Sequence, residues 1–468
     1  MTSRSYLTSD QDRFAELSGD FNPLHVDPVH ARRLMFGAAA VHGVHNLLWS
    51  LEVWAANGEG PVTLQSVNAA FTKPVAVGTT VRCATRSSEP TRERLQLFIG
   101  DDVVAKVDFT WAPAENGHPA AESGAFTKQM PDEHSEYAEL SGQLPLIMDS
   151  SLATEMFPNL MRRCSPRQIA ALLASTKMVG MHCPGLHSVF SELNIKFTPE
   201  AAASGFAYRV TRHDPRFSML SIELSGEVAG SVTAFVRPKP RDQASFANLS
   251  ALVSASAFAG QRAVVVGGSR GLGEVVAKLL AAGGAEVMIT YHQGATDAAA
   301  ICDEINQAGG KAASCAYNVL LASDTPHETL STWGATHLYY FATPHISTGK
   351  RGRFSMPLYE KFSAYYAGGL SSTLNVLGVK QLKAVYCPSS VFIDTPPDTL
   401  LEYSAAKATA EFVCSSLQKQ HGMVYQLFMP RLPKMDTDQT ASFGEASGLD
   451  PSQVMAQSLL DIHLPVSA

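Results

Sequence analysis

The sequence lacks the cysteine patterns of a disulfide framework or a zinc site. Its 7 cysteines are an odd number, and no two of them stand in a C-x-x-C pair. Disulfide-rich domains and structural zinc sites depend on cysteines paired at short, fixed spacings. We therefore expect reduced thiols, no bound metal and a reducing compartment, the cytoplasm.

Long apolar runs and basic runs are also missing. No apolar stretch reaches the roughly 18–20 residues that a membrane span requires, and the segment MTSRSYLTSDQDRF has no apolar core of a secretory leader. The formal net charge of −7 arises from mixed signs. The sequence thus predicts no membrane span and no nucleic-acid partner, because nucleic-acid-binding surfaces are strongly basic.

The chain is too long for one ordinary core. Its 468 residues predict about three domains. Two stretches rich in Pro, Gly, Ser, Ala and charge, residues 113–142 and 238–259, are expected as linkers, although the apolar end of the second also fits a docked helix. They separate the segments 1–112, 143–237 and 260–468.

The first two segments follow one plan, a helix and then an antiparallel sheet, which is an α+β pattern. The first predicts a helix near residues 42–56 and four strands within 62–112, and the second repeats this with a helix near 165–181. The strings VNAAFTKP (67–74) and LNIKFTPE (193–200) place a Phe-Thr step at the end of corresponding strands. This favours an internal duplication.

The third segment changes to an α/β pattern. Residues 261–291 read as a buried strand, a glycine turn, an amphipathic helix and a second buried strand, which predicts a doubly wound parallel sheet of the Rossmann type. Gly267, Gly271 and Gly273 let the backbone of the turn approach a pyrophosphate. Further along, Tyr403 and Lys407 are four residues apart on a predicted helix, so the ammonium can lower the pKa of the phenol and favour proton transfer to a carbonyl oxygen.

The strings GGSRGLG and YSAAK, with Ser390 thirteen residues before Tyr403, resemble the short-chain dehydrogenase/reductase family over residues 260–468. The resemblance implies that Tyr403 is the general acid/base, that Lys407 holds the nicotinamide ribose and tunes Tyr403, and that Ser390, or Ser389 if the strand ends one residue earlier, binds the substrate carbonyl.

The same resemblance implies a nicotinamide cofactor. Its expected contacts are Gly267, Ser269, Arg270, Gly271, Leu272, Gly273, Asn318, Val319, Lys407 and Thr437. The chain departs from the family pattern in three places: Arg431 replaces a glycine, residues 341–344 replace an Asn-Asn-Ala-Gly turn, and residues 365–372 hold no equivalent of the helix-four asparagine. The string MITYHQG offers no carboxylate for a ribose 2′-hydroxyl, and Arg270 can face a 2′-phosphate, so we expect NADPH.

Asp20 and His25 lie in one predicted turn that an Asn-Pro step constrains, so they can act as an acid/base pair. A dehydratase needs one group to remove the α-proton of a 3-hydroxyacyl thioester and another to protonate the departing hydroxyl, while an amide at a helix N-terminus stabilises the enolate-like oxygen. The string S-G-D-x-N-P-x-H, with F-G, V-H-G and FTKPVAVGTTV after it, resembles the MaoC-like (R)-specific enoyl-thioester hydratases of the hot-dog fold over residues 1–112.

That resemblance implies that Asp20 and His25 are the catalytic pair, that Asn22 supports the loop, and that the Gly43 amide is the oxyanion donor. We expect His42 and His45 in packing or at the helix start. The second segment has no D-x-N-P-x-H string. Its His182, Cys183 and His187 show no evident base-orienting partner, so we expect a non-catalytic hot dog that completes an acyl tunnel.

The sequence therefore predicts an α+β double hot dog followed by a Rossmann-type reductase. We expect a homo-oligomer that reduces 3-oxoacyl thioesters with NADPH at Tyr403 and then dehydrates the (R)-3-hydroxyacyl product, on a carrier protein or coenzyme A, in fatty-acid, polyketide or polyene biosynthesis. Two alternatives remain: hydration followed by NAD-linked oxidation in chain degradation, and a degenerate hot dog that only binds acyl chains or carrier proteins.

Overall fold

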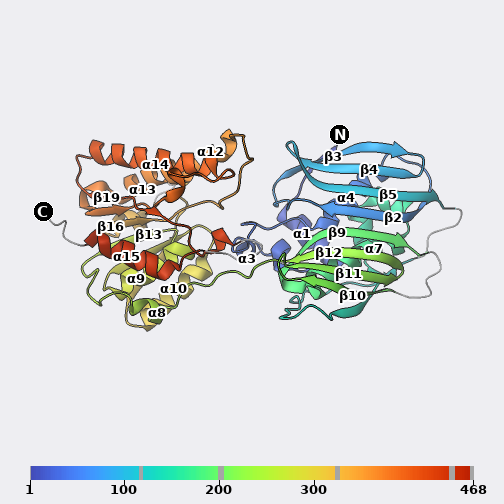
Figure 1. Cartoon of the computed structure of the whole chain (residues 1–468), viewed down its shortest axis with the longest axis horizontal. Coiled ribbons are helices and arrows are strands. Elements are labelled where there is room, and N and C mark those ends of the chain that lie inside the picture. Colours follow the sequence, from blue (N-terminus) through green and yellow to red (C-terminus); the bar gives the residue numbers. More distant parts are fainter. Residues whose placement is uncertain (1, 115–119, 199–204, 322–326, 442–447, 464–468) are drawn as a thin grey trace. The chain divides into compact units, whose positions relative to one another are not determined.

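The computed structural model describes residues 2–114, 120–198, 205–321, 327–441 and 448–463. They form two compact units, one within Met1–Lys239 and the other from Pro240 onward (Figure 1). Segments 1–112 and 143–237, which the sequence separates, thus belong to a single unit.

The first unit is built on one antiparallel sheet of ten strands, and its strand order is the same when read outward from the centre in either direction. From one edge to the other the strands are β1 (Thr2–Ser5), β3 (Thr80–Glu89), β4 (Arg92–Ile99), β5 (Asp102–Pro113), β2 (Val62–Phe71), β9 (Ser188–Phe197), β12 (Val228–Val236), β11 (Met219–Gly226), β10 (Gly205–Asp214) and β7 (Ser141–Pro145). Each half therefore contributes five strands, and the strands of the two halves follow matching orders outward from the centre of the sheet.

The centre of the sheet is the pairing of β2 with β9. Asn68 lies opposite Asn194, and Ala69 lies opposite Leu193. These strands carry the two similar strings of the sequence, in which Asn68 and Asn194 occupy equivalent positions. The equivalent residues thus meet at the point about which the two halves are related.

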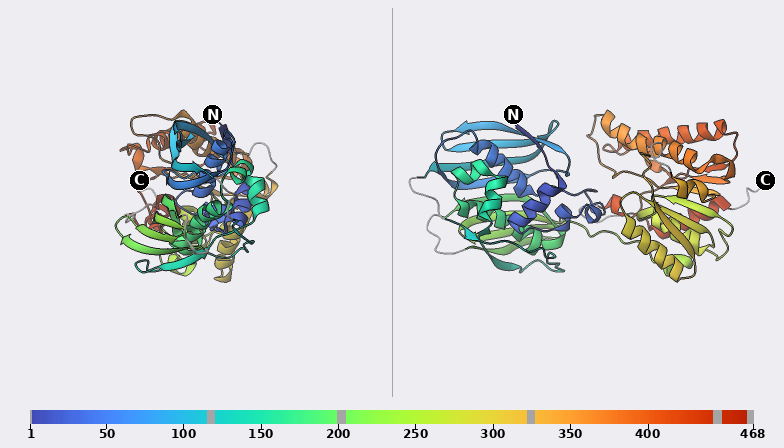
Figure 2. Two further views of the ribbon diagram at one scale, coloured as in Figure 1. Left: turned by 90° about the vertical axis from the view of Figure 1, so that its right-hand side faces the viewer. Right: turned by 180° about the vertical axis from the view of Figure 1, so that it is seen from behind.

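Helices cover one face of this sheet (Figure 2, right panel). Helix α4 (Gly43–Ala55) buries Val44, Leu47, Leu48 and Leu51, an i, i+3, i+4, i+7 stripe, because that face of the helix packs on the sheet. The other helices of the unit are α1 (Thr8–Ser18), α2 (Pro23–Val26), α3 (Pro28–Ala31), α5 (Ser150–Met156), α6 (Pro158–Arg163) and α7 (Pro166–Lys177), and a π-helical turn, Met178–His182, extends α7.

Residues 113–142, expected as a linker, contribute to the first unit where the structure describes them. Strand β6 (Glu122–Ser123) pairs with β8 (Ile147–Met148), and the Asp132 N–H donates to the Met181 carbonyl at 2.8 Å. Tyr137 is buried. The polar composition of this stretch reflects its exposed side chains, while its backbone bonds to the rest of the unit.

The second unit is an α/β fold around a six-stranded parallel sheet. The strand order is β15 (Lys311–Ala316), β14 (Glu286–Tyr291), β13 (Arg262–Val266), β16 (His337–Tyr340), β17 (Ala384–Tyr386) and β19 (Gln426–Phe428). This 3-2-1-4-5-6 order is that of a doubly wound dinucleotide-binding sheet, whose ligands bind at the carboxyl ends of the strands.

Helices cover both faces of the parallel sheet (Figure 1). One apolar core holds side chains of α8 (Phe246–Ser250), α9 (Gly271–Ala282), α10 (Ala295–Gln307) and α15 (Pro451–His463), and the opposite core holds α11 (Glu328–Thr332), α13 (Leu370–Leu377) and part of α14 (Leu401–Gln420). Helix α12 (Met356–Ser363) packs on α14. Because Phe246, Leu249 and Phe258 are buried in the first core, most of the predicted linker 238–259 is part of the domain.

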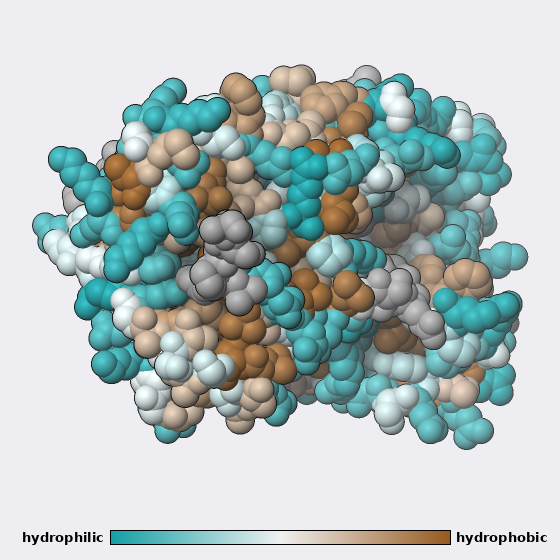
Figure 3. All heavy atoms as spheres, turned by 60° about the vertical axis from the view of Figure 1, so that its left-hand side comes forward, coloured by the Kyte–Doolittle hydropathy of each residue, from teal (hydrophilic) through white to brown (hydrophobic). Residues whose placement is uncertain are grey.

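The surface is polar on the face that Figure 3 draws, where hydrophobic side chains occur in small groups separated by hydrophilic ones. Within the described ranges, no helix combines the length and the apolar character that crossing a bilayer requires.

Candidate functional site

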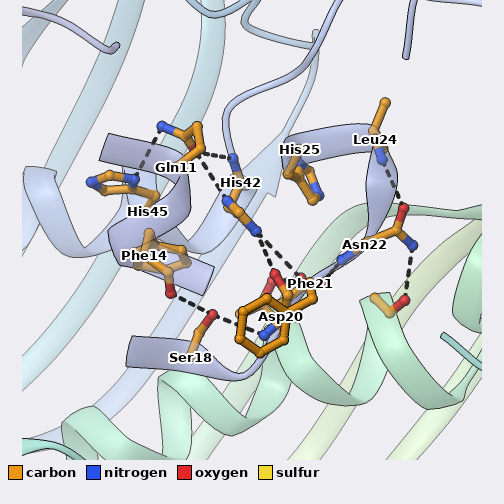
Figure 4. Close-up of polar contacts among 12 residues, drawn as sticks. Gln11, Phe14, Ser18, Asp20, Phe21, Asn22, Leu24, His25, His42 and His45 are labelled. Atoms are coloured by element: carbon orange, nitrogen blue, oxygen red, sulfur yellow. Dashed lines mark hydrogen bonds and ion pairs between the residues drawn. The ribbon is translucent and has the colours of Figure 1, made fainter. Parts of the chain in front are cut away.

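Asp20 lies in the loop between α1 and α2, and His25 lies in the short helix α2 that follows (Figure 4). Helix α1 ends at Gly19, whose φ of 76° is the left-handed conformation that glycine adopts readily. Asn22 then caps α2, because its side chain accepts from the Leu24 N–H, and Pro23 fills the first helical position. The S-G-D-x-N-P-x-H string is therefore a helix stop followed at once by a helix start.

The Asp20 carboxyl group is 1% exposed. It accepts hydrogen bonds from the Thr176 hydroxyl at 2.7 Å and from the Asn22 N–H at 3.2 Å. Burial, which disfavours the ionised form, outweighs these two donors and raises the pKa of Asp20 to about 7. Asp20 can therefore hold or release a proton near neutral pH.

The second half of the chain supplies the walls around Asp20, and sequence reasoning missed them. Thr176 lies in α7 and Gly180 in the turn that extends it. A Cβ atom at Gly180 would come within 2.1 Å of Asp20 Oδ1, and the Gly180 carbonyl accepts from Asn22 Nδ2 at 2.8 Å. The only sign of this contact in the sequence was Gly180 itself, a glycine within the predicted helix string MVGM.

His25 lies beside Asp20 with one ring nitrogen occupied. Its Nδ1 donates to the Ala40 carbonyl at 2.7 Å, so the neutral ring carries its lone pair on Nε2. Burial lowers the pKa of His25 to about 4. His25 is thus a neutral base at physiological pH, and its ring stacks on His42 with centroids 3.8 Å apart.

His42 is part of this cluster, beyond the packing role that the sequence predicts. Its Nδ1 lies 2.9 Å from Gln11 Oε1, and its Nε2 lies 3.0 Å from the Asp20 carbonyl oxygen. Candidate ligand atoms of Asp20, His25 and His42 lie within 4.8 Å of one another. Because both His42 nitrogens already face oxygen atoms, the cluster does not offer three free ligands to a metal ion.

The predicted oxyanion donor, Gly43, is the first residue of α4, directly after His42. Its N–H belongs to the first turn, where backbone donors lack an intrahelical partner and the helix dipole is positive. A Cβ atom at Gly43 would approach the Phe71 ring to 3.0 Å. An amide able to stabilise negative charge thus begins the helix next to the Asp20 loop.

His182 and His187, which lacked evident partners in the sequence, have carboxylate partners in the structure. His182 Nδ1 lies 2.9 Å from Asp132 Oδ2, and His187 Nε2 lies 3.1 Å from Glu133 Oε1. Cys183 is fully buried, and burial raises the pKa of its thiol to about 12. A thiol that stays protonated is a poor nucleophile, so this cluster does not form a cysteine-based site.

In the second unit, the glycine turn joins β13 to α9. Gly267 and Gly271 have φ values of 76° and 57°, and a Cβ atom at Gly273 would lie 2.3 Å from the Gly267 carbonyl oxygen. All three positions therefore need glycine, and they leave a backbone cradle at the helix N-terminus where a phosphate fits. Ser269 is buried in the same turn, and Arg270 and Leu272 flank Gly271.

The other predicted cofactor residues surround the carboxyl ends of the strands. Arg270 Nη1 lies 3.8 Å from Asp438, and Asp438 follows Thr437, the cap of a short 3₁₀ turn. Asn318 Oδ1 accepts from the Leu320 N–H, and Val319 is buried.

Helix α14 presents Tyr403 and Lys407 on one face. Lys407 Nζ donates to the Pro388 carbonyl at 2.9 Å, immediately before Ser389 and Ser390. The Ser390 hydroxyl oxygen accepts from the Phe392 N–H at 3.2 Å, and both serines are buried at β18 (Ser389–Ser390). The structure thus brings Lys407 to the strand end that carries both predicted serines, and Tyr403 lies one turn before Lys407 on α14.

A tyrosine occupies the region where the family has the helix-four asparagine. Tyr366 lies in a π-helical turn, Ala364–Gly369, with its ring 4.1 Å from Lys407 Nζ and its centroid 5.9 Å from that of Tyr403. Its hydroxyl lies 2.8 Å from Thr343 Oγ1. Thr343 belongs to the Phe341–Pro344 departure, so the two departures contact each other.

The third departure, Arg431, forms ion pairs with Asp394 and Glu411. It therefore ties the loop after β19 to α14, a role that glycine could not fill.

Replacing Gly180 with alanine should destabilise the first unit, because the new methyl group overlaps the Asp20 carboxyl group. We expect a loss of about 1–3 kcal/mol in its free energy of unfolding, the usual effect of overpacking. In an Asp20→Ala background the same substitution should cost much less. Urea unfolding of the four proteins measures this, and equal losses in both backgrounds would contradict the assigned contact.

Asp20→Asn should shift stability in a pH-dependent way. The pKa of Asp20 is about 7 in the folded protein and 3.8 in the unfolded reference. Between these values the folded state holds a proton that the unfolded state has lost, so the free energy of unfolding falls as the pH rises from about 4 through about 7. Asparagine keeps an acceptor for Thr176 and does not ionise. The difference in Tm, variant minus wild type, should therefore become more positive between pH 5 and pH 8.5 in calorimetry, and a constant difference would contradict the raised pKa.

The comparisons with known proteins match both parts of the chain. A family model described as MaoC like domain matches residues 2–102, and one described as short chain dehydrogenase matches residues 261–332. A 3-hydroxybutyryl-CoA dehydratase of Methylorubrum extorquens is 34% identical over 106 residues, which are 21% of this chain and 66% of that protein. The match thus spans just under two thirds of the relative's length.

Among solved structures, a dehydrogenase/reductase from Sinorhizobium meliloti is 23% identical, with a TM-score of 0.40, over 46% of this chain and 91% of that chain. An NADP-bound 3-oxoacyl (acyl-carrier-protein) reductase from Agrobacterium tumefaciens is 19% identical, with a TM-score of 0.39, over 43% and 87%. From the two family models, the chain contains a MaoC-like dehydratase domain at its N-terminus and a short-chain dehydrogenase domain in its C-terminal part.

Proposed function

We propose that the chain is a bifunctional enzyme that reduces 3-oxoacyl thioesters with NADPH and dehydrates the resulting (R)-3-hydroxyacyl thioesters, on coenzyme A or a carrier protein, during fatty-acid, polyketide or polyene biosynthesis. The observation that carries the proposal is a pair of proton-transfer sites in one chain. Asp20 and His25 form one, with raised and lowered pKa values, and Tyr403 with Lys407 forms the other.

The first unit is, in this proposal, a double hot dog with one catalytic half. The mirrored strand order and the Asn68 to Asn194 pairing support a duplication. The second half completes the site with Thr176 and Gly180 rather than with an acid/base pair of its own.

For dehydration, His25 Nε2 removes the α-proton, since the neutral ring carries its lone pair there. The electrons of the C–H bond form the Cα=Cβ bond as the C–O bond breaks, and protonated Asp20 gives its proton to the departing hydroxyl, which leaves as water. The Gly43 N–H stabilises the charge on the thioester oxygen. Transfer of the proton from His25 back to Asp20 restores the site.

For reduction, Tyr403 gives a proton to the substrate carbonyl oxygen while the Ser390 hydroxyl donates a hydrogen bond to it. Lys407, held by the Pro388 carbonyl, lies one helical turn after Tyr403 and would hold the nicotinamide ribose. NADPH, when bound, supplies the hydride. The glycine cradle fits its pyrophosphate, and Arg270, with no carboxylate at the end of β14, fits its 2′-phosphate.

The two activities should separate by single substitutions. Asp20→Asn should lower dehydration by about 10²–10⁴-fold, the typical contribution of a general acid or base, while NADPH consumption on a 3-oxoacyl thioester stays at the wild-type rate. Tyr403→Phe should do the reverse. Asp12→Asn, at an exposed site on α1, is the control for the first variant, and loss of both activities in either active-site variant would contradict the assignment.

The pH profile of wild-type dehydration tests the roles within the pair. Because Asp20 must be protonated and His25 neutral, kcat/KM should stay high between about pH 4 and about pH 7 and fall above it.

A strong preference for NAD over NADPH would favour the degradative direction instead, and tight acyl-thioester binding without turnover would favour a binding module.

Tyr366 should support reduction through its ring. Tyr366→Phe keeps a ring under the Lys407 ammonium and loses only the hydroxyl contact with Thr343, whereas Tyr366→Leu loses both. A buried cation–π contact is worth about 2 kcal/mol, so kcat for reduction should fall by about 10- to 30-fold in the leucine variant and much less in the phenylalanine variant. Dehydration by the same proteins is the control, and equal effects of the two variants would exclude a role for the ring.

A further inference from the structure

Arg237 is a buried guanidinium close to the Asp20 loop. It follows β12 directly, is 1% exposed, and its N–H donates to the His187 carbonyl at 2.7 Å. Its Nη2 donates to the Leu186 carbonyl, which also accepts from Asn22 Nδ2 at 3.3 Å. Arg237 is thus joined through one carbonyl oxygen to Asn22, which stands between Asp20 and His25 in the chain.

The charge of Arg237 has no counter-charge in the part of the chain that the structure describes. Its Nε and Nη1 are buried without a hydrogen-bond partner, and it forms no ion pair with a described carboxylate. The nearby Glu133 is engaged by His187 and Lys239. Burial lowers the pKa of Arg237 to about 10, so the side chain stays protonated at neutral pH and needs compensation.

Two histidines of the same unit also carry buried ring nitrogens without a hydrogen-bond partner. His30 Nε2 and His187 Nδ1 are also buried without a partner. Burial lowers the pKa of both histidines and that of His25, and the positive charge of Arg237 lowers all three further. Unsatisfied buried polar groups are rare in folded proteins and cost free energy. The two unpartnered nitrogen atoms of Arg237, which is joined to Asn22 through the Leu186 carbonyl, therefore point to a ligand.

We propose that Arg237 binds an anionic oxygen group of the acyl-thioester substrate. Guanidinium groups are suited to carboxylate and phosphate oxygens, and a buried one binds them strongly because no water competes. The inference rests on the proposed dehydratase function, because it takes the ligand to be the substrate of Asp20 and His25. The anion has two sources: a phosphate of the coenzyme A or carrier-protein arm, or a carboxylate on the acyl chain.

Arg237→Met tests the site, because methionine keeps much of the length and removes the charge. Three thioesters separate the sources: 3-hydroxybutyryl-coenzyme A, 3-hydroxybutyryl-N-acetylcysteamine, which has no anionic group, and 3-hydroxyglutaryl-N-acetylcysteamine, which has a carboxylate only on the acyl chain. The full-length variant should raise KM about 10- to 100-fold, as removal of one partner of a buried charge pair does, for the anionic substrates that the site binds. KM for the neutral thioester should not change.

An effect confined to the coenzyme A substrate identifies the phosphate, and an effect on the glutaryl thioester identifies the acyl carboxylate. Unchanged KM for all three, or an equal rise for all three, overturns the proposal. Arg209→Met, at an exposed arginine of β10 that pairs with Glu223, is the matched control and should leave every KM unchanged.

Thermal unfolding provides a readout independent of turnover. Without ligand, Arg237→Met should unfold at the same temperature as wild type or higher, because it removes an uncompensated buried charge; a lower temperature would indicate a structural arginine and contradict the proposal. Free coenzyme A and glutarate serve as probes, and at least one should raise the Tm of wild type but not of the variant. If wild type shows no dehydration while this shift is present, the proposed function fails and the anion site stands.

Discussion

The antiparallel pairing of β2 with β9 is the constraint on which the first unit depends. Without it, each half would end in an exposed edge strand with a row of unpaired backbone groups, which invites aggregation. With it, the two sheets become one, and their helices lie on the same face. That arrangement brings the end of α7 against the loop after α1, so Asp20 receives the Thr176 hydroxyl from a residue 156 positions away.

The proton transfer proposed for Asp20 depends on a balance between burial, which raises the pKa of its carboxyl group, and hydrogen bonds, which lower it. A carboxyl group with several strong donors would be ionised at neutral pH, and one with none would be protonated far above it. Two donors, one from each half of the chain, leave its pKa near 7. Gly180 is needed for the same balance, because a side chain there would displace the carboxyl group from Thr176. Burial also lowers the pKa of His25, so at neutral pH the ring stays neutral while Asp20 can hold a proton.

Local patterns predicted much of this architecture. The helix near residues 42–56, the four strands within 62–112, the glycine turn and the helix after it follow from side chains within a few residues of one another. The structure has α4, β2 to β5, the turn and α9 at these places. The prediction of a linker at residues 113–142 did not anticipate its contacts with the first unit. Composition indicates which side chains face solvent, but not whether the backbone joins a sheet, as β7 does from Ser141. Contacts that join residues far apart, such as Thr176 with Asp20 or Tyr366 with Lys407, had no local signal.

Helix α6 in the second half of the first unit also depends on a residue of the first half. Helix α6 packs on α4, and α1 packs on α7, so each half contacts a helix of the other. Glu52 of α4 accepts from the N–H groups of Asn159 and Leu160 at 3.1 and 2.7 Å and caps the start of α6. Side chains therefore join the two halves in both directions, since Glu52 caps a helix of the second half and Thr176 donates to Asp20 in the first. In the proposed reaction the second half serves the first through Thr176 and Gly180.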